Sequence, residues 1–130
     1  MFKLLVVEDE DNIREGIVET IELCSKIFKV FSACNGIEAL NLIQNEKIDA
    51  MILDIKMPKL DGIELLKILS SKNIDIKTII LSGYDQFDYA KSALEYGAID
   101  YILKPIKPSN ITIMIEKLKE ERANERNKET

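Results

Sequence analysis

The sequence predicts a doubly wound α/β fold, in which a five-stranded parallel sheet is covered by five helices on its two faces. Two kinds of segment alternate along the 130 residues. One kind is short, apolar and rich in β-branched residues. The other carries apolar residues three and four positions apart, as in a helix packed on one side. Apolar strands that alternate with amphipathic helices are typical of a parallel sheet buried on both faces.

Five apolar segments are expected to form the strands. Each is short and bounded by polar or turn-forming residues, and none shows the alternation of a half-exposed strand. Because a parallel connection needs a crossover, each strand should be followed by a helix on the right-handed path. The expected strands are Lys3–Val7, Phe28–Ala33, Ala50–Leu53, Thr78–Leu81 and Tyr101–Leu103.

Five segments with helical spacing follow these strands. Asn35 and Gly36 mark the start of the second helix, and Pro108 precedes the last one. Gly97 lies where the fourth helix should end, because glycine tolerates the positive φ found at many helix ends. The expected helices are Asn12–Leu23, Gly36–Asn45, Gly62–Ser71, Gln86–Tyr96 and Ser109–Lys119.

The C-terminal segment has a different character. Glu120–Thr130 is almost wholly charged or polar and has no apolar face. This composition predicts the frayed end of the last helix, running into a linker. Residues 1–120 are therefore expected to form one domain, and residues 121–130 a polar helix end or linker tail.

Composition excludes several classes of function. No apolar run is long enough to span a bilayer, and the N-terminus lacks the pattern of a signal peptide, so we expect a cytoplasmic protein with no membrane contact. The net charge of −5 argues against binding of nucleic acid by this segment. The sequence has no histidine, which excludes Ser-His-Asp and Cys-His sites and a phosphohistidine donor within the chain.

Polar residues follow four of the expected strands, at the edge where open α/β sheets bind their ligands. Glu8 and Asp9 follow the first strand, and Asp54 follows the third. Ser82 and Lys104 follow the fourth and fifth strands. Taken singly, such residues are commonly helix caps, turn residues or surface groups. Together they supply one acceptor, two further acids, one hydroxyl and one ammonium at a single edge.

This set of side chains points to phosphoryl chemistry. If the first and third strands are neighbours, Glu8, Asp9 and Asp54 converge, and crowded carboxylates need a proton or a cation between them. Oxygen ligands without His or Cys suit Mg²⁺. A carboxylate can attack phosphorus and form an aspartyl phosphate, while Lys104 and Ser82 would hold the remaining phosphoryl oxygens.

The sequence resembles the receiver domain of two-component response regulators. The resemblance covers the chain from Met1 to about Leu118. It implies a flavodoxin-like fold with strand order 2-1-3-4-5 and a phosphoryl donor that is a sensor histidine kinase. Four stretches carry it: Leu4–Glu10, Ile52–Gly62, Leu81–Gly83 and Tyr101–Pro105.

The resemblance assigns the acidic residues to the acceptor and metal sites. Asp54 corresponds to the phosphorylated aspartate. Glu8, Asp9 and Asp54 would bind Mg²⁺, together with the backbone carbonyl of Lys56. Glu8 stands where the family more often has Asp, which lengthens the reach to the metal by one methylene group.

Further residues correspond to the catalytic and switch positions of the family. Ser82 and Lys104 would contact the phosphoryl group, and Gly83, where Ala is more usual, would lie beside it with a backbone N–H. The resemblance also implies a cis peptide between Lys104 and Pro105. Ser82 and Tyr101 would form the switch, with Tyr101 moving between inward and outward rotamers.

The resemblance further implies how the domain acts on its partners. It would not be an enzyme, beyond catalysing its own phosphorylation and dephosphorylation. Phosphorylation would change the surface formed by the fourth helix, fifth strand and fifth helix, and a homodimer through this surface is expected. The aromatic residues of Tyr84–Ala90 could be exposed there, or could pack in the core.

Two accounts of the output remain open. The stretch Leu81–Ala90 resembles receivers that precede an AraC-type DNA-binding domain, so DNA would be contacted only through a domain outside this sequence. In that case the polar tail is a linker and the chain is part of a transcription regulator. The alternative is a stand-alone receiver.

Three other classes of protein fit these residues less well. A haloacid-dehalogenase phosphatase needs a second acid two residues after its aspartate nucleophile, where this chain has Lys56. A flavodoxin needs a hydroxyl- and glycine-rich phosphate loop after the first strand, where Glu8–Asp11 would repel a phosphate. A pseudo-receiver, which folds but is not phosphorylated, is disfavoured by the complete set of acceptor, acids, hydroxyl and lysine.

Overall fold

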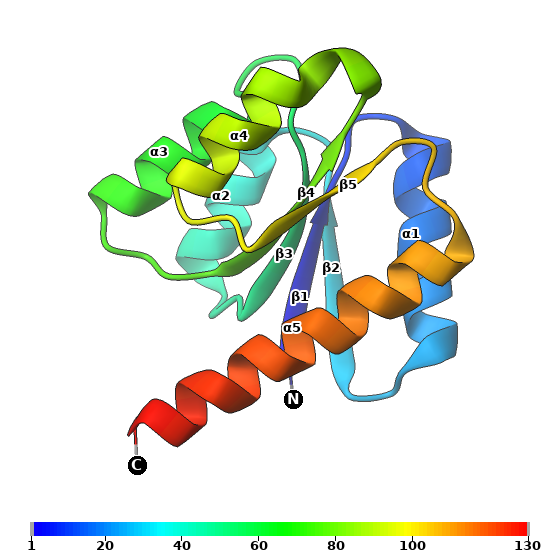
Figure 1. Ribbon diagram of the computed structural model, residues 1–130, viewed down its shortest axis with the longest axis vertical. Coiled ribbons are helices and arrows are strands. Elements are labelled where there is room, and N and C mark those ends of the chain that lie inside the picture. The colour runs from blue at the N-terminus through cyan, green and yellow to red at the C-terminus, as the bar shows by residue number, and fades with distance from the viewer. Residues whose placement is uncertain (1, 130) are drawn as a thin grey trace.

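Strands and helices alternate along the chain, as the sequence predicts (Figure 1). The computed structural model describes the backbone of residues 2–129, and the side chains of these residues except 84, 122 and 125–129. The elements are β1 (Phe2–Val7), α1 (Asp11–Cys24), β2 (Phe28–Ala33), α2 (Gly36–Asn45), β3 (Ala50–Asp54), α3 (Gly62–Ser71), β4 (Lys77–Ser82), a 3₁₀ turn (Tyr84–Gln86), α4 (Phe87–Glu95), β5 (Asp100–Leu103) and α5 (Pro108–Glu129).

All five strands belong to one parallel sheet with the order β2-β1-β3-β4-β5. This confirms the predicted architecture. The register sets the level at which each strand ends. Val7 of β1 lies opposite Ala33 of β2 and Leu53 of β3, so that Glu8 and Asp54, the next residues, emerge beside each other.

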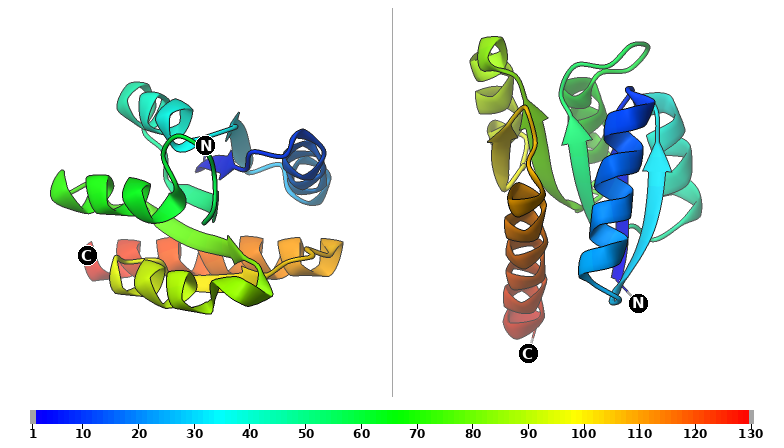
Figure 2. Two further views of the ribbon diagram at one scale, coloured as in Figure 1. Left: turned by 90° about the horizontal axis from the view of Figure 1, so that it is seen from above. Right: turned by 90° about the vertical axis from the view of Figure 1, so that its right-hand side faces the viewer.

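The two faces of the sheet bury separate hydrophobic clusters. Side chains alternate between the faces along each strand, so Leu4 and Val6 belong to one cluster and Leu5 and Val7 to the other. The first cluster packs against α1 and α5, and the second against α2, α3 and α4. Figures 1 and 2 show this division, with α1 and α5 on the opposite side of the sheet from the other three helices.

Local hydrogen bonds define the ends of several helices. The Asn35 side chain accepts a hydrogen bond from the Glu38 amide and caps α2. Asp61 and Glu64 form a reciprocal capping box at the start of α3. Gly97 follows α4 with φ of 101°, the positive value that the sequence predicted for this position.

The fifth helix is longer than predicted. Its first half buries Ile111, Met114, Ile115 and Leu118, but the helix continues to Glu129 (Figure 2). The added residues include Glu, Lys, Arg and Ala, which have high helix propensity, so the backbone stays helical without an apolar face. Among the described residues, no helix is both long and apolar enough to cross a bilayer.

Gly62 and Gly16 provide a matched test of packing next to the site. A Cβ on Gly62 would lie 2.7 Å from the Asp54 carbonyl oxygen and 3.0 Å from Ile55 Cα, both of which are backbone atoms. We therefore expect Gly62→Ala to lower the free energy of unfolding by about 1–3 kcal/mol. Gly16→Ala in α1 meets nothing within 4 Å and should raise it by about 0.5–1 kcal/mol. Urea unfolding measures both, and equal effects of the two changes would contradict this account.

Candidate functional site

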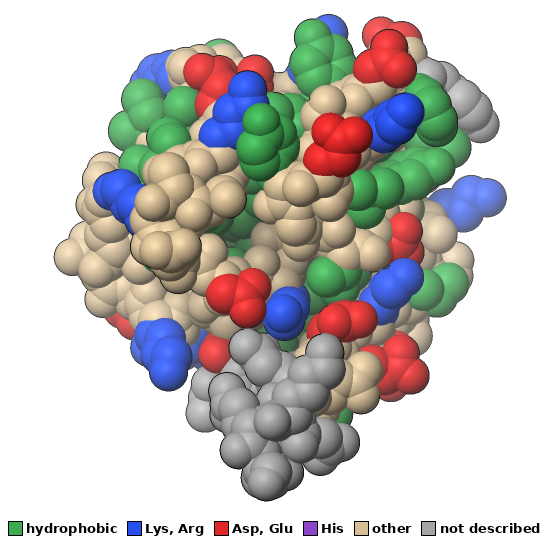
Figure 3. Space-filling model, turned by 60° about the vertical axis from the view of Figure 1, so that its left-hand side comes forward, with side chains coloured by type: hydrophobic (Ala, Val, Ile, Leu, Met, Phe, Trp, Pro, Cys, Tyr) green, Lys and Arg blue, Asp and Glu red, His purple; other side chains and the backbone are tan. Residues whose placement is uncertain are grey.

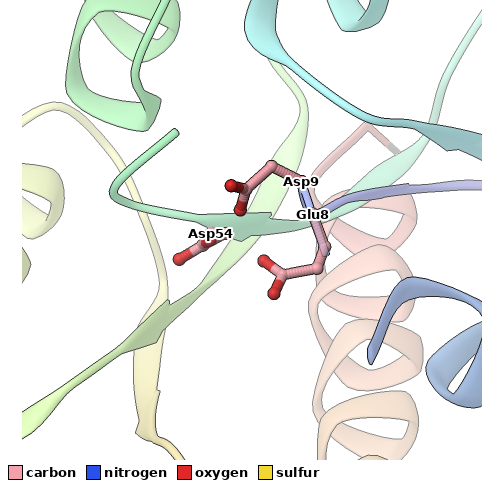
Figure 4. A group of neighbouring side chains, drawn as sticks. All are labelled: Glu8, Asp9 and Asp54. Atoms are coloured by element: carbon pink, nitrogen blue, oxygen red, sulfur yellow. The ribbon is translucent and has the colours of Figure 1, made fainter. Parts of the chain in front are cut away.

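Three carboxylates and one ammonium group meet at the carboxyl end of the sheet. Ligand oxygens of Glu8, Asp9 and Asp54 all lie within 4.8 Å of one another (Figure 4). Glu8 and Asp54 are buried, with 0% and 1% of their surface exposed, while Asp9 is exposed. The Lys104 Nζ lies 3.0 Å from Asp54 Oδ1 and 3.5 Å from Glu8 Oε1.

Strand alternation explains why these groups face one another. Glu8 continues the set of β1 side chains that pack toward α1 and α5, and Asp54 continues the equivalent set of β3. Lys104 follows β5 on the same face, since Ile102 packs in that cluster. Because β1 and β3 are neighbours, Glu8 and Asp54 emerge side by side. Lys104 follows β5, which is separated from β3 by β4, and its side chain reaches both carboxylates.

Hydrogen bonds to two backbone carbonyls hold the chain in place just beyond β1 and β3. The Arg14 Nη1 of α1 donates a 2.9 Å hydrogen bond to the Glu8 carbonyl, and its Nη2 pairs with Asp11 at 2.6 Å. On the other side, the Gly62 amide donates to the Ile55 carbonyl at 2.8 Å and turns the chain directly after Asp54. Arg14 was not foreseen from the sequence, because an arginine in an amphipathic helix has no distinguishing spacing.

The crowded acids shift the pKa values of the site. Burial and the adjacent Asp54 carboxylate raise the pKa of Glu8 from 4.5 to about 9. Burial and Asp54 also raise the pKa of Asp9. Burial lowers the pKa of Lys104, but the hydrogen bond and charge of Asp54 and the charge of Glu8 raise it more, so the ammonium stays charged.

The donor set fits a hard divalent cation. Three carboxylates face one ammonium, which leaves excess negative charge at the site. Among the described residues, the buried side-chain oxygens left without a well-formed hydrogen bond are both Glu8 oxygens and Asp54 Oδ1, and the Lys104 ammonium is the cation that the structure places beside them. Buried polar atoms normally have partners, so these carboxylate oxygens indicate that a cation binds between them. Oxygen-only coordination of this kind suits Mg²⁺.

The remaining predicted residues surround this cluster. Ser82 is fully buried and its Oγ donates to the Gly83 carbonyl at 3.2 Å. The peptide between Lys104 and Pro105 is cis. Tyr101 is half-buried against the cluster that packs on α2, α3 and α4. The exposed Lys56 side chain does not join the acids; its Nζ lies 5.4 Å from the centroid of the Tyr89 ring on α4.

Comparison with known families identifies similar proteins over nearly the whole chain. A family model described as the response regulator receiver domain matches residues 4–116. The transcriptional regulatory protein HptR of Staphylococcus aureus is 36% identical over 119 residues, which are 91% of this chain and 46% of HptR. The chain therefore spans less than half the length of this curated relative.

Solved structures give the same result. The REC domain of AraT, a response regulator from Geobacillus stearothermophilus, is 36% identical with a TM-score of 0.87, over 96% of this chain and 98% of that one. A response regulator receiver domain protein from Clostridium thermocellum is 30% identical with a TM-score of 0.85, over 95% of this chain and 98% of the other. Both similarities extend over nearly the whole of this chain.

The raised pKa of Glu8 predicts a pH dependence of stability. Between pH 4.5 and about 9 the folded protein keeps a proton on Glu8 that the unfolded chain has lost. The free energy of unfolding without metal should therefore fall as pH rises through this range, and Glu8→Gln should weaken that fall. Urea unfolding in EDTA at several pH values measures it. Glu22→Gln, at an exposed position of α1, is the control and should follow wild type; parallel curves for wild type and Glu8→Gln would contradict the assignment.

Proposed function

This chain belongs to the response regulator receiver domain family, and on that basis we propose that Asp54 accepts a phosphoryl group from a sensor histidine kinase in a Mg²⁺-dependent reaction. The observation that carries the proposal is the buried Asp54 carboxylate, 3.0 Å from the Lys104 ammonium and beside two further carboxylates. No other described residues group three potential metal-binding side chains in this way. The chemistry is therefore assigned to the carboxyl end of β3.

The proposed transfer forms an acyl phosphate on Asp54. One carboxylate oxygen attacks the phosphorus of the kinase phosphohistidine, the phosphorus–nitrogen bond breaks, and its electron pair stays with the imidazole, which takes a proton from solvent. Lys104, already within ion-pair distance of Asp54, offsets negative charge on the transferred oxygens. The Ser82 hydroxyl would leave the Gly83 carbonyl and donate to a phosphoryl oxygen.

Glu8, Asp9 and Asp54, with the backbone carbonyl of Lys56, would hold the metal ion. Bound Mg²⁺ supplies positive charge that stabilises the oxygens of the transferred group. The buried Glu8 must release its proton for this, and Arg14 keeps the Glu8 backbone in position. The domain would thus catalyse only its own phosphorylation and dephosphorylation, and would not turn over a separate substrate.

We propose that the phosphorylated domain forms a homodimer through the surface of α4, β5 and α5. Large hydrophobic side chains are exposed on all three elements: Phe87 by 64%, Tyr89 by 43%, Leu103 by 41% and Ile113 by 60%. Phe87 and Tyr89 are exposed, so the alternative prediction that they pack in the core is wrong. The face drawn in Figure 3 carries exposed hydrophobic groups among Lys, Arg, Asp and Glu, a mixture suited to a transient interface.

The proposed output is control of transcription. HptR, by its name, is a transcriptional regulatory protein, and it is more than twice as long as the part that aligns with this chain. The net charge of −5 does not suit direct contact with DNA, so DNA binding is assigned to an output domain outside this sequence. The length of the intact gene product separates this proposal from a stand-alone receiver.

Phosphorylation is tested by intact mass after incubation with acetyl phosphate and Mg²⁺. We expect one phosphoryl group on the wild type, and none without Mg²⁺ or in Asp54→Asn, because the mutant lacks the nucleophilic carboxylate. Circular dichroism checks that the mutant is folded. An unmodified wild type would favour a pseudo-receiver or a strict requirement for the kinase, and a modified Asp54→Asn would place the acceptor elsewhere.

Coupling between the site and the surface is tested with Ser82→Ala. The mutant should still be phosphorylated but should dimerise more weakly than the wild type, because the hydroxyl that follows the phosphoryl group is gone. Analytical ultracentrifugation with acetyl phosphate and Mg²⁺ measures this, with the phosphorylated fraction determined by mass. Ser70→Ala, at an exposed position of α3, is the control; equal dimerisation of all three phosphorylated proteins would exclude the coupling.

A further inference from the structure

One backbone donor next to the acceptor site is capped by a side chain, in a capping-box contact at the start of the 3₁₀ turn. The Gly83 amide, directly after β4, donates a 2.7 Å hydrogen bond to Oε1 of the Gln86 side chain. The Gln86 amide in turn donates to the Gly83 carbonyl at 3.1 Å. Gln86 is half-buried and lies at the junction of the 3₁₀ turn with α4.

The backbone alternation of β4 shows which way the Gly83 amide faces. The Leu81 carbonyl accepts a hydrogen bond from Ile55, just beyond β3, and the Ser82 carbonyl accepts one from Lys104, just beyond β5. Gly83 is still extended, with φ of −84° and ψ of 170°, so its N–H turns back toward the end of β3. Asp54 is the last residue of β3 and pairs with Leu81.

The sheet does not supply a partner for this amide. A continued parallel ladder would pair the Gly83 N–H with the Ile55 carbonyl, but that carbonyl accepts from Gly62, where the chain turns into α3. The Gly83 N–H therefore faces the Asp54 side of the site, and a side chain from the next turn satisfies it. Gly83 also has no Cβ to obstruct an approaching group.

We propose that Gln86 is a positioning residue that holds the Gly83 amide until a phosphoryl group on Asp54 takes its place. This inference rests on the proposed phosphorylation of Asp54. A phosphoryl oxygen carries charge and accepts a stronger hydrogen bond than a neutral amide oxygen, so the exchange of partners is favourable. It needs no movement of β4, only withdrawal of the Gln86 side chain.

The exchange would carry the signal into α4. Gly83 is the shared partner of two groups, since its carbonyl accepts from Ser82 Oγ and from the Gln86 amide. Phosphorylation would draw the Ser82 hydroxyl away and release the Gln86 side chain together. The 3₁₀ turn then loses two of the contacts that anchor it, and α4 begins at the next residue, Phe87. The exposed Phe87 and Tyr89 lie in the first turn that would shift.

The test compares Gln86→Met, which keeps the side-chain size but removes the acceptor, with Gln44→Met on the exposed face of α2. Each protein is titrated with beryllium fluoride, a phosphoryl analogue, in the presence of Mg²⁺. Losing the competing hydrogen bond should tighten binding of the analogue about two- to tenfold in Gln86→Met. The Gln44→Met variant should match wild type.

Amide hydrogen exchange at Gly83, followed by NMR, separates this role from that of a simple cap. In wild type we expect protection with and without the analogue, and altered Gln86 side-chain amide signals when it binds. In Gln86→Met the Gly83 amide should exchange rapidly until the analogue binds.

Three results would overturn the proposal: equal analogue affinity in Gln86→Met and Gln44→Met, unchanged Gln86 signals in wild type, or rapid Gly83 exchange in the bound mutant. The wild-type signals decide the matter even if Gln86→Met does not fold. Failure of wild type to bind the analogue at Asp54 would instead remove the phosphorylation on which the proposal rests.

Discussion

The structure depends on one electrostatic constraint, the burial of negative charge at the carboxyl end of a parallel sheet. The Glu8 and Asp54 side chains are buried next to each other, and the single charge of Lys104 can neutralise only one of the two carboxylates. Folding alone would favour neutral side chains there, because uncompensated buried charge is costly. Protonation of Glu8 in the metal-free protein lowers this cost, because burial and Asp54 raise the pKa of Glu8 to about 9. In the metal-free protein the proton on Glu8 offsets part of the buried negative charge, and a bound cation could take over that role.

The rest of the fold makes this arrangement rigid. Each central strand is buried on both faces, so a one-residue slip in register would move a whole set of apolar side chains to the wrong cluster. The same register fixes where Glu8 and Asp54 emerge. The apolar packing therefore determines where the polar side chains of the site lie. Hydrogen bonds from Arg14 and Gly62 then fix the backbone just beyond β1 and β3.

The sequence was sufficient for much of this description. Asp54, Glu8 and Lys104 could be predicted as neighbours because they directly follow apolar strands, and strand ends are the part of an α/β fold that periodicity locates best. Arg14 and Gln86 could not, since their contacts depend on how a loop turns and not on spacing. The length of α5 was underestimated because a helix without an apolar face gives no periodic signal. Whether the domain ends at residue 120 stays a prediction.

The long α5 also has a geometric consequence. Its 22 residues span about 33 Å at 1.5 Å per residue, and its charged half projects past the sheet as a single rod. A segment that continues this helix would have its direction and its rotation about the helix axis fixed by the helix. Adding or deleting one residue in the projecting half would turn that segment by about 100° and move it by about 1.5 Å along the axis. The number of residues in this half therefore sets where such a segment lies, as long as the half stays helical.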